Sequence, residues 1–257
     1  MSQRQIKYRF YATLLDAFQN YLDSEINYSK FYSSDSPSLS CDEYESKVFC
    51  EFIDKINRVP FSSEAADKGT AFNEVVDCLI SSTKSEKCEF SLDETTGNVF
   101  SEYKGQKFVF PLKLCREFAD YYKGGASQVF VSGVIETKYG VVELYGYIDE
   151  LMPFTIHDIK TTKHYQSAKF INHWQHKVYP YCLSQLGCDN WLFEYNVTDF
   201  NDTYTESYGY EPGKYVPELI DHCERLIEFL ERYRHLITDR KIFNLPDDEQ
   251  ASDTNKE

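Results

Sequence analysis

Two aspartates occur where neighbouring strands of a sheet would bring their side chains together. The segments Tyr145–Glu150 and Phe154–Lys160 are rich in strand-forming residues, and Met152-Pro153 breaks the chain between them. Asp149 and Asp158 would then lie side by side. A pair of carboxylates suits Mg²⁺ or Mn²⁺, because such ions usually take one or two carboxylates and keep several waters. The spacing therefore predicts a metal site at these two residues.

A lysine accompanies the second aspartate. Side chains alternate along a strand, so Asp158 and Lys160 share a face, while Ile159 offers its backbone carbonyl. An ammonium group there stabilises charge on a phosphoryl group or helps to deprotonate water. Acid-x-Lys triplets also begin at Glu45 and Glu136, where a surface ion pair is the simpler interpretation. The position between a Gly-x-x-Asp strand and a Gln-x-x-x-Tyr segment favours a catalytic Lys160.

Downstream, the segment Ser167–Leu186 has the apolar spacing of a helix, and Gln175 and Tyr179 lie four residues apart on one of its faces. This segment and the loop before it contain no carboxylate, but they contain Lys163 and Lys177. A basic patch on an acidic protein suits contact with a phosphate backbone. We therefore predict substrate-binding roles for these four side chains. The alternative is an amphipathic core helix with a solvated basic face.

Upstream, a helix is predicted to begin near Gly69. Its apolar residues cover one side, and Asn73, Glu74 and Asp77 share the other. These polar side chains form either the solvent edge of the helix or a third contribution to the metal site.

In this order, the four motifs resemble those of the PD-(D/E)XK nucleases, and in particular the RecB-like exonucleases of phage or bacterial type. The resemblance covers Gly69–Val197, roughly half of the chain. It implies that Asp149 and Asp158 bind the metal and that Ile159 adds a carbonyl. It also implies that Lys160 is catalytic and that Gln175 and Tyr179 organise the site.

The chain departs from the family pattern at one position of the first helix. RecB-like members commonly carry a metal-binding histidine where this chain has Asn73. The resemblance therefore leaves two possibilities: Asn73 supplies a carbonyl oxygen, with Glu74 or Asp77 as a carboxylate, or activity is lost. Some relatives also hold an iron-sulfur cluster. Here the eight cysteines are scattered without a Cys-x-x-Cys pair, so no iron-sulfur cluster is expected.

The order of predicted elements agrees with the resemblance. Helix, three strands, helix and strand form a restriction-endonuclease-like α/β core, in which helices flank a central mixed β-sheet. Added helices precede and follow it. The predicted strands are Val129–Lys138, Val141–Glu150, Phe154–Lys160 and Asn190–Val197, and the predicted helices include Tyr8–Tyr21, Cys41–Ile56, Leu112–Tyr122 and Pro217–Thr238.

The order of the predicted elements divides the chain into four regions. They are an N-terminal helical cap (1–66), the nuclease core (67–200) with an inserted hairpin region near 89–110, a C-terminal helical region (201–245) and a disordered acidic tail (246–257).

The composition of the chain indicates its cellular compartment and the kinds of partner it can bind. The chain has 257 residues and a net charge of −15, with neither a membrane-length apolar run nor the apolar core of a signal peptide. We expect a cytoplasmic protein that does not associate with membranes. The acidic balance argues against general affinity for nucleic acid, but it allows a nuclease that concentrates positive charge in one groove.

The resulting functional hypothesis is a metal-dependent deoxyribonuclease, an exonuclease of recombination, repair or phage DNA processing that uses Mg²⁺ or Mn²⁺. Its expected partners are double- or single-stranded DNA, a single-strand-binding or annealing protein, and further copies of the chain. Two alternatives remain. One is a catalytically inactive nuclease-fold protein that binds nucleic acid or a protein partner. The other is an unrelated α/β protein in which the motifs are accidental.

Overall fold

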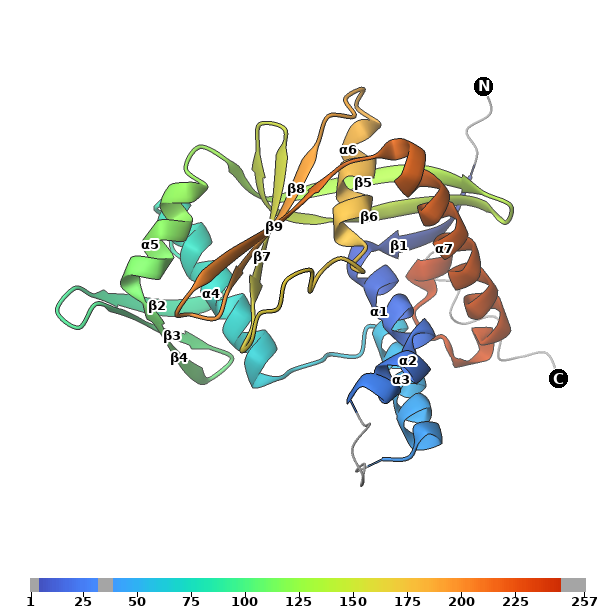
Figure 1. Cartoon of the computed structure of the whole chain (residues 1–257), viewed down its shortest axis with the longest axis horizontal. Coiled ribbons are helices and arrows are strands. Elements are labelled where there is room, and N and C mark those ends of the chain that lie inside the picture. Colours follow the sequence, from blue (N-terminus) through green and yellow to red (C-terminus); the bar gives the residue numbers. More distant parts are fainter. Residues whose placement is uncertain (1–4, 32–38, 246–257) are drawn as a thin grey trace.

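Six strands form the central sheet in the computed structural model, which describes residues 5–31 and 39–245 (Figure 1). The strand order is β1-β6-β7-β8-β9. β1 and β7 pair with different parts of one edge of β6, and β5 pairs with its opposite edge. β1 runs parallel to β6 and β7 runs parallel to β8, whereas the other pairs are antiparallel. The protein is thus an α/β protein with a mixed sheet. The bounds are β1 (Ile6–Tyr11), β5 (Ala126–Thr137), β6 (Gly140–Met152), β7 (Thr155–Thr161), β8 (Leu192–Thr198) and β9 (Thr203–Gly209).

Strand β6 has two neighbours on one of its edges. β5 pairs with it from Gly140 to Leu151, so β1 and β7 must share the opposite edge. β1 occupies that edge up to Tyr145, and β7 begins to pair at Glu150. In the described part of the chain, residues 146–149 have no strand partner there. The sheet therefore contains a gap beside the predicted metal ligand Asp149.

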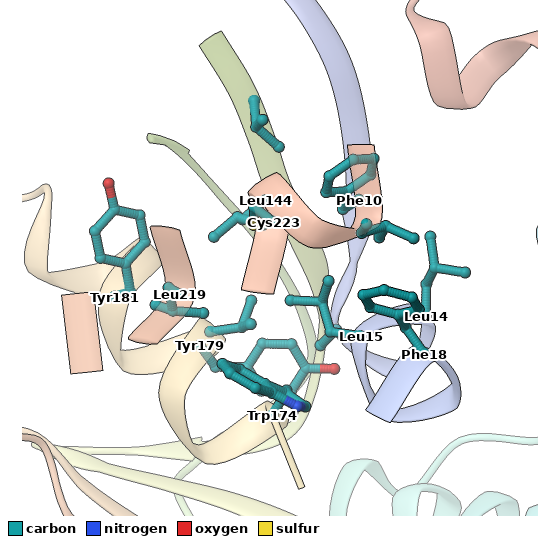
Figure 2. Packing of buried hydrophobic residues seen from close by; sticks show 14 of the residues in the cluster. Phe10, Leu14, Leu15, Phe18, Leu144, Trp174, Tyr179, Tyr181, Leu219 and Cys223 are labelled. Carbon is teal, nitrogen blue, oxygen red and sulfur yellow. The ribbon is translucent and has the colours of Figure 1, made fainter. Parts of the chain in front are cut away.

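Helices α1 (Ala12–Leu22), α6 (Gln175–Ser184) and α7 (Pro212–Arg232) pack together with β1, β5 and β6. Figure 2 shows Phe10, Leu15, Leu144, Trp174 and Leu219 meeting in this core. Helices α2 (Ser24–Phe31) and α3 (Cys41–Ile56) extend the group through α1. Each fully buried leucine or phenylalanine contributes about 1.5–3 kcal/mol of transfer free energy, so these helices are held by burial of their apolar faces.

A second core lies on the other side of β7 (Figure 1). Phe72 and Val76 of helix α4 pack with Phe110 and with Ile159 of β7. Gly69 brings α4 close to the end of β7, since a Cβ atom there would lie only 2.9 Å from Thr161 Oγ1. The elements of this core are α4 (Glu64–Ser81), α5 (Leu112–Tyr121) and a separate antiparallel sheet of β2 (Cys88–Asp93), β3 (Asn98–Tyr103) and β4 (Gln106–Pro111).

Most predicted elements are present, but four features differ from the predictions. The predicted helix Tyr8–Tyr21 is wrong at its start, because residues up to Tyr11 form strand β1 within the region expected to be a helical cap. Strand β9 was not expected in the C-terminal region. The helix predicted from Ser167 begins only at Gln175. The region near 89–110 forms a three-stranded sheet rather than a single hairpin.

The domain boundaries stay predictions, and the predicted tail 246–257 lies outside the described residues. Within the described residues, no helix combines the length and the apolar character needed to span a membrane.

Candidate functional site

The gap in the sheet opens into a cavity of about 440 Å³. Its walls come from β6, β7, α4, α6 and the first turn of α1, elements that lie far apart in the sequence. Six of the predicted site residues line it directly, together with Ile159: Asn73, Asp149, Asp158, Lys160, Gln175 and Tyr179.

Asp149 occupies the place where β6 and β7 separate. Its Oδ2 atom accepts a hydrogen bond of 2.9 Å from the backbone N–H of Ile159, which replaces the bond that a strand partner would provide. Burial, together with the smaller effect of the negative charge on Asp158, raises the pKa of Asp149 to about 7. The carboxyl group is thus fixed to β7 and close to a second acid.

Lys160 faces Asp158, as alternation along β7 predicts. Its Nζ atom lies 2.6 Å from Asp158 Oδ2. Burial alone lowers the pKa of Lys160, but attraction to Asp158 and Asp149 outweighs burial, so the pKa lies above its usual value. The lysine is therefore held as a cation beside two carboxylates.

Gln175 connects this ion pair to helix α6. Its Nε2 donates a hydrogen bond of 2.7 Å to Asp158 Oδ1, and its Oε1 accepts one of 2.9 Å from Lys160 Nζ. The same Nε2 lies 3.5 Å from the hydroxyl of Tyr179. The Gln-x-x-x-Tyr motif thus fixes the orientation of both the aspartate and the lysine.

The glycine of the Gly-x-x-Asp strand has a steric role. A Cβ atom on Gly146 would lie 2.6 Å from Cε1 of Tyr179, which is closer than such atoms approach in proteins. Only glycine lets the tyrosine ring rest on β6 at this position. The spacing between Gly146 and Asp149 therefore sets the ring of Tyr179 near the carboxylate pair.

Among the three polar candidates on α4, only Asn73 lines the cavity. Its Oδ1 atom is buried and has no hydrogen-bond partner among the described residues. Glu74 accepts hydrogen bonds from Lys87 (2.6 Å) and Ser85 (2.7 Å), away from the cavity. Asp77 accepts one of 3.2 Å from Gln128. The structure therefore brings one amide oxygen, and neither helix carboxylate, to the cavity.

The two predicted substrate-binding lysines also lie elsewhere. Lys163 lines a separate cavity of about 310 Å³, which Lys68 and Phe200 share. Lys177 forms an ion pair of 2.8 Å with Glu218 on α7. The basic residues of the segment therefore do not form one patch at the carboxylates.

Several residues at the site were not among the predicted site residues. Tyr145 and Tyr147 line the cavity, and their alternation with Asp149 along β6 is a signal that could have identified them. Asp16 on α1 accepts a hydrogen bond from the backbone N–H of Trp174, directly before α6. Burial raises the pKa of Asp16 to about 6. Arg58 also lines the cavity, and it follows α3 at a position that no local pattern marks.

The available metal donors are oxygens. In residues 5–31 and 39–245, no group of three or more histidine, cysteine, aspartate or glutamate side chains is placed to hold a metal. The cavity instead combines the carboxylates of Asp149 and Asp158 with the amide oxygen of Asn73.

No protein-family model and no curated protein matches this chain. Among solved structures, the chain is similar to the crystal structure of SSO0001, with a TM-score of 0.44 and 12% sequence identity. The similarity covers 89% of this chain and 79% of that one.

Proposed function

We propose that the protein is a metal-dependent nuclease with a centre of the PD-(D/E)XK type. The observation that supports this most is the meeting of Asp149, Asp158 and Lys160 in one cavity, with the ammonium group 2.6 Å from the second carboxylate. The two acids belong to different strands, and Gln175 holds the ion pair from a third element. This arrangement suits hydrolysis of a phosphodiester better than it suits a structural ion pair, because it lies at an open cavity.

The donor set fits Mg²⁺ or Mn²⁺. Asn73 Oδ1 is buried and has no hydrogen-bond partner within the described residues, whereas Asp158 Oδ2 lies 2.6 Å from the ammonium group of Lys160. Hard oxygen atoms of this kind are the ligands that both ions prefer. Asp149, Asp158, Asn73 and the carbonyl of Ile159 would hold the ion. When bound, such an ion lowers the pKa of its water and stabilises negative charge on the phosphoryl group.

The chain's own residues then have separate roles. Lys160 remains protonated beside the two acids and is placed to stabilise charge that develops on a phosphate oxygen. Gln175 prevents both Lys160 and Asp158 from rotating away. The pKa of Asp149 is raised by burial and by the charge of Asp158, and its carboxyl group would be deprotonated in order to hold a cation.

The finer parts of this proposal rest on the order of the motifs. They are the restriction-endonuclease-like core, membership of the RecB-like branch, DNA as the substrate and exonucleolytic action in recombination, repair or phage DNA processing. The gap in the sheet beside Asp149 supports the placement of the centre but does not select among these substrates.

A catalytically inactive nuclease-fold protein is the second candidate, and Asn73 favours it. An amide stands at the cavity wall where the resemblance implies a histidine ligand. Lys160 and Gln175 also take up both oxygens of Asp158 in the described residues, which suits a protein that does not bind a metal.

Digestion of end-labelled linear DNA, in double- and single-stranded forms, tests the proposal. Wild type, Lys160→Ala and the control Lys113→Ala, an exposed lysine on α5, are compared with Mg²⁺, Mn²⁺ or EDTA. We expect metal-dependent degradation by wild type and control, and at least a roughly 100-fold slower reaction for Lys160→Ala. The product ladder separates exonuclease from endonuclease action. Equal inactivity of all three folded proteins with either metal would favour the inactive protein.

A further inference from the structure

One face of strands β5 and β6 is exposed and aromatic. Along β5, Phe130 and Val134 are exposed whereas Val131 and Ile135 are buried, so alternate side chains project to solvent. Phe130 is 50% exposed and its pairing partner Tyr147 on β6 is 58% exposed. Exposed apolar side chains that form a contiguous patch often mark an interaction site.

The rings form a continuous row. Their centroids are separated by 6.1 Å from Tyr11 to Tyr145, by 6.3 Å from Tyr145 to Phe130 and by 5.2 Å from Phe130 to Tyr147. We call these four residues the aromatic face. It crosses three strands, since Tyr11 pairs with Tyr145 across β1 and β6, and Phe130 pairs with Tyr147 across β5 and β6.

Arginines accompany the aromatic face. Arg58 Cζ lies 5.1 Å from the ring centre of Tyr11, and its Nη2 donates a hydrogen bond of 2.8 Å to the hydroxyl of Tyr145. Arg9 Cζ lies 5.3 Å from the ring centre of Tyr145. Asp239 and Glu143 pair with these two guanidinium groups. A guanidinium has five N–H donors, more than one carboxylate uses, so both retain the capacity to contact phosphate.

The aromatic face leads into the candidate site. Tyr145, Tyr147 and Asp149 are alternate residues of one strand, and all three line the same cavity, as do Tyr11 and Arg58. A chain of bases lying on the rings would therefore bring its backbone to the carboxylates and Lys160.

We propose that the aromatic face binds an unpaired DNA strand by base stacking and directs it to Asp149. Successive bases stack on aromatic side chains only when they are unpaired, and arginines contact the adjacent phosphates. The inference deepens the proposed nuclease function and rests on it for DNA as the ligand. A protein partner or a second copy would instead cover the rings and exclude the strand.

Fluorescence anisotropy with a fluorescein-labelled oligothymidine, measured in EDTA so that no cleavage occurs, tests the inference. We expect Phe130→Ala and Tyr147→Ala each to weaken binding about tenfold, and the double variant to weaken it further. Tyr147→Phe keeps a ring and should bind like wild type. Phe100→Ala removes a comparably exposed phenylalanine, 43% exposed, from the separate β2–β4 sheet and should also bind like wild type.

Contrary results have distinct meanings. Wild-type affinity in the double variant, or no binding by wild type, would overturn the inference. A wild-type dimer that becomes monomeric in the double variant during size-exclusion chromatography would also overturn it, because the face would then be a self-interface. The alanine variants could bind more weakly in EDTA, as expected, while wild type degrades no DNA in Mg²⁺ or Mn²⁺. That combination would support the role of the aromatic face and contradict the proposed nuclease activity.

Discussion

Two pairs of carboxylates lie in the interior beside strand β6, and they differ in their neighbours. Asp149 and Asp158 face a cavity, and Lys160 Nζ lies 2.6 Å from Asp158 Oδ2. Asp77 accepts a hydrogen bond from Gln128, Glu150 accepts hydrogen bonds from Ser127, and the two carboxyl groups also bond to each other. Burial raises the pKa of Glu150 to about 8 and that of Asp77 to about 6.

The two pairs offset the repulsion between their carboxylates in different ways. Asp77 and Glu150 bond to each other and reduce their repulsion by retaining a proton. Lys160 offsets part of the repulsion between Asp149 and Asp158, and the cavity lets a cation and substrate reach them. The two pairs thus differ in two respects: Asp149 and Asp158 have an ammonium group beside them and face an open cavity, whereas the pKa values of Asp77 and Glu150 are raised by burial.

We expect the largest difference between the two carboxylate pairs in enzymatic activity. Asp158→Asn removes a proposed metal ligand, and we expect digestion of linear DNA in Mg²⁺ to slow at least about 100-fold. Glu150→Gln imitates the protonated acid of the other pair and should change the initial rate by less than about threefold. Circular dichroism confirms that both variants fold. A similar loss in the two variants would show that the pairs act as one site.

Metal binding separates the two pairs without reference to catalysis. At a concentration about 100-fold above its dissociation constant, an ion that binds only the folded state adds about 2.7 kcal/mol of stability. We expect Mn²⁺ to raise the melting temperature of wild type and Glu150→Gln by about 5–10 °C, as measured by differential scanning fluorimetry. The shift should vanish in Asp158→Asn and after chelation. Its persistence in Asp158→Asn would place the metal elsewhere.

Tyr179 packs against Gly146 of β6 in the cavity that contains Asp149 and Asp158. Gly146→Ala places a Cβ atom 2.6 Å from the ring, so we expect a loss of about 1–3 kcal/mol in the free energy of unfolding by urea. Gly209→Ala on β9 is the matched control, because its Cβ atom would meet no heavy atom within 4 Å. Equal stability of the two variants would mean that the ring moves without cost.

Titration of Glu150 should produce the smallest effect. Its pKa is raised from 4.5 to about 8, so the folded state holds the proton more tightly than the unfolded state. The resulting stability is present below about pH 4.5 and is lost as pH rises through about pH 8. Over this range the melting temperature of wild type should fall further than that of Glu150→Gln, which has no carboxyl group at this position to titrate. Parallel pH profiles would contradict the assignment.

The elements that sequence could predict are those whose signals are local. Strands β5, β6 and β7 follow one another along the chain, so alternation and turns were enough to place Asp149 and Asp158 on neighbouring strands. Lys160 followed from the same alternation. The spacing of Gln175 and Tyr179 likewise predicted that both project from one helix face.

The missed features depend on distant partners. Residues Tyr8–Tyr11 were predicted to be helical because Phe10 continues the helical spacing of α1, whereas their strand partner β6 begins at Gly140. α6 begins late because Glu206 on β9 accepts hydrogen bonds from the backbone of Lys169 and Phe170, which holds that segment outside the helix. No window of local sequence contains these partners.

The pairing of Ile6 with Val141 has a consequence for the order in which the chain acquires its site during synthesis. β1 leaves the ribosome first, but the edge that receives it exists only after β6 has been made. Non-local parallel pairings of this kind form slowly. Gln175 and Tyr179 emerge later still, so a nascent chain that ends before α6 contains Asp149 and Lys160 without the helix that orients them. The candidate centre is therefore assembled only after α6 has been made, when segments far apart in the sequence meet.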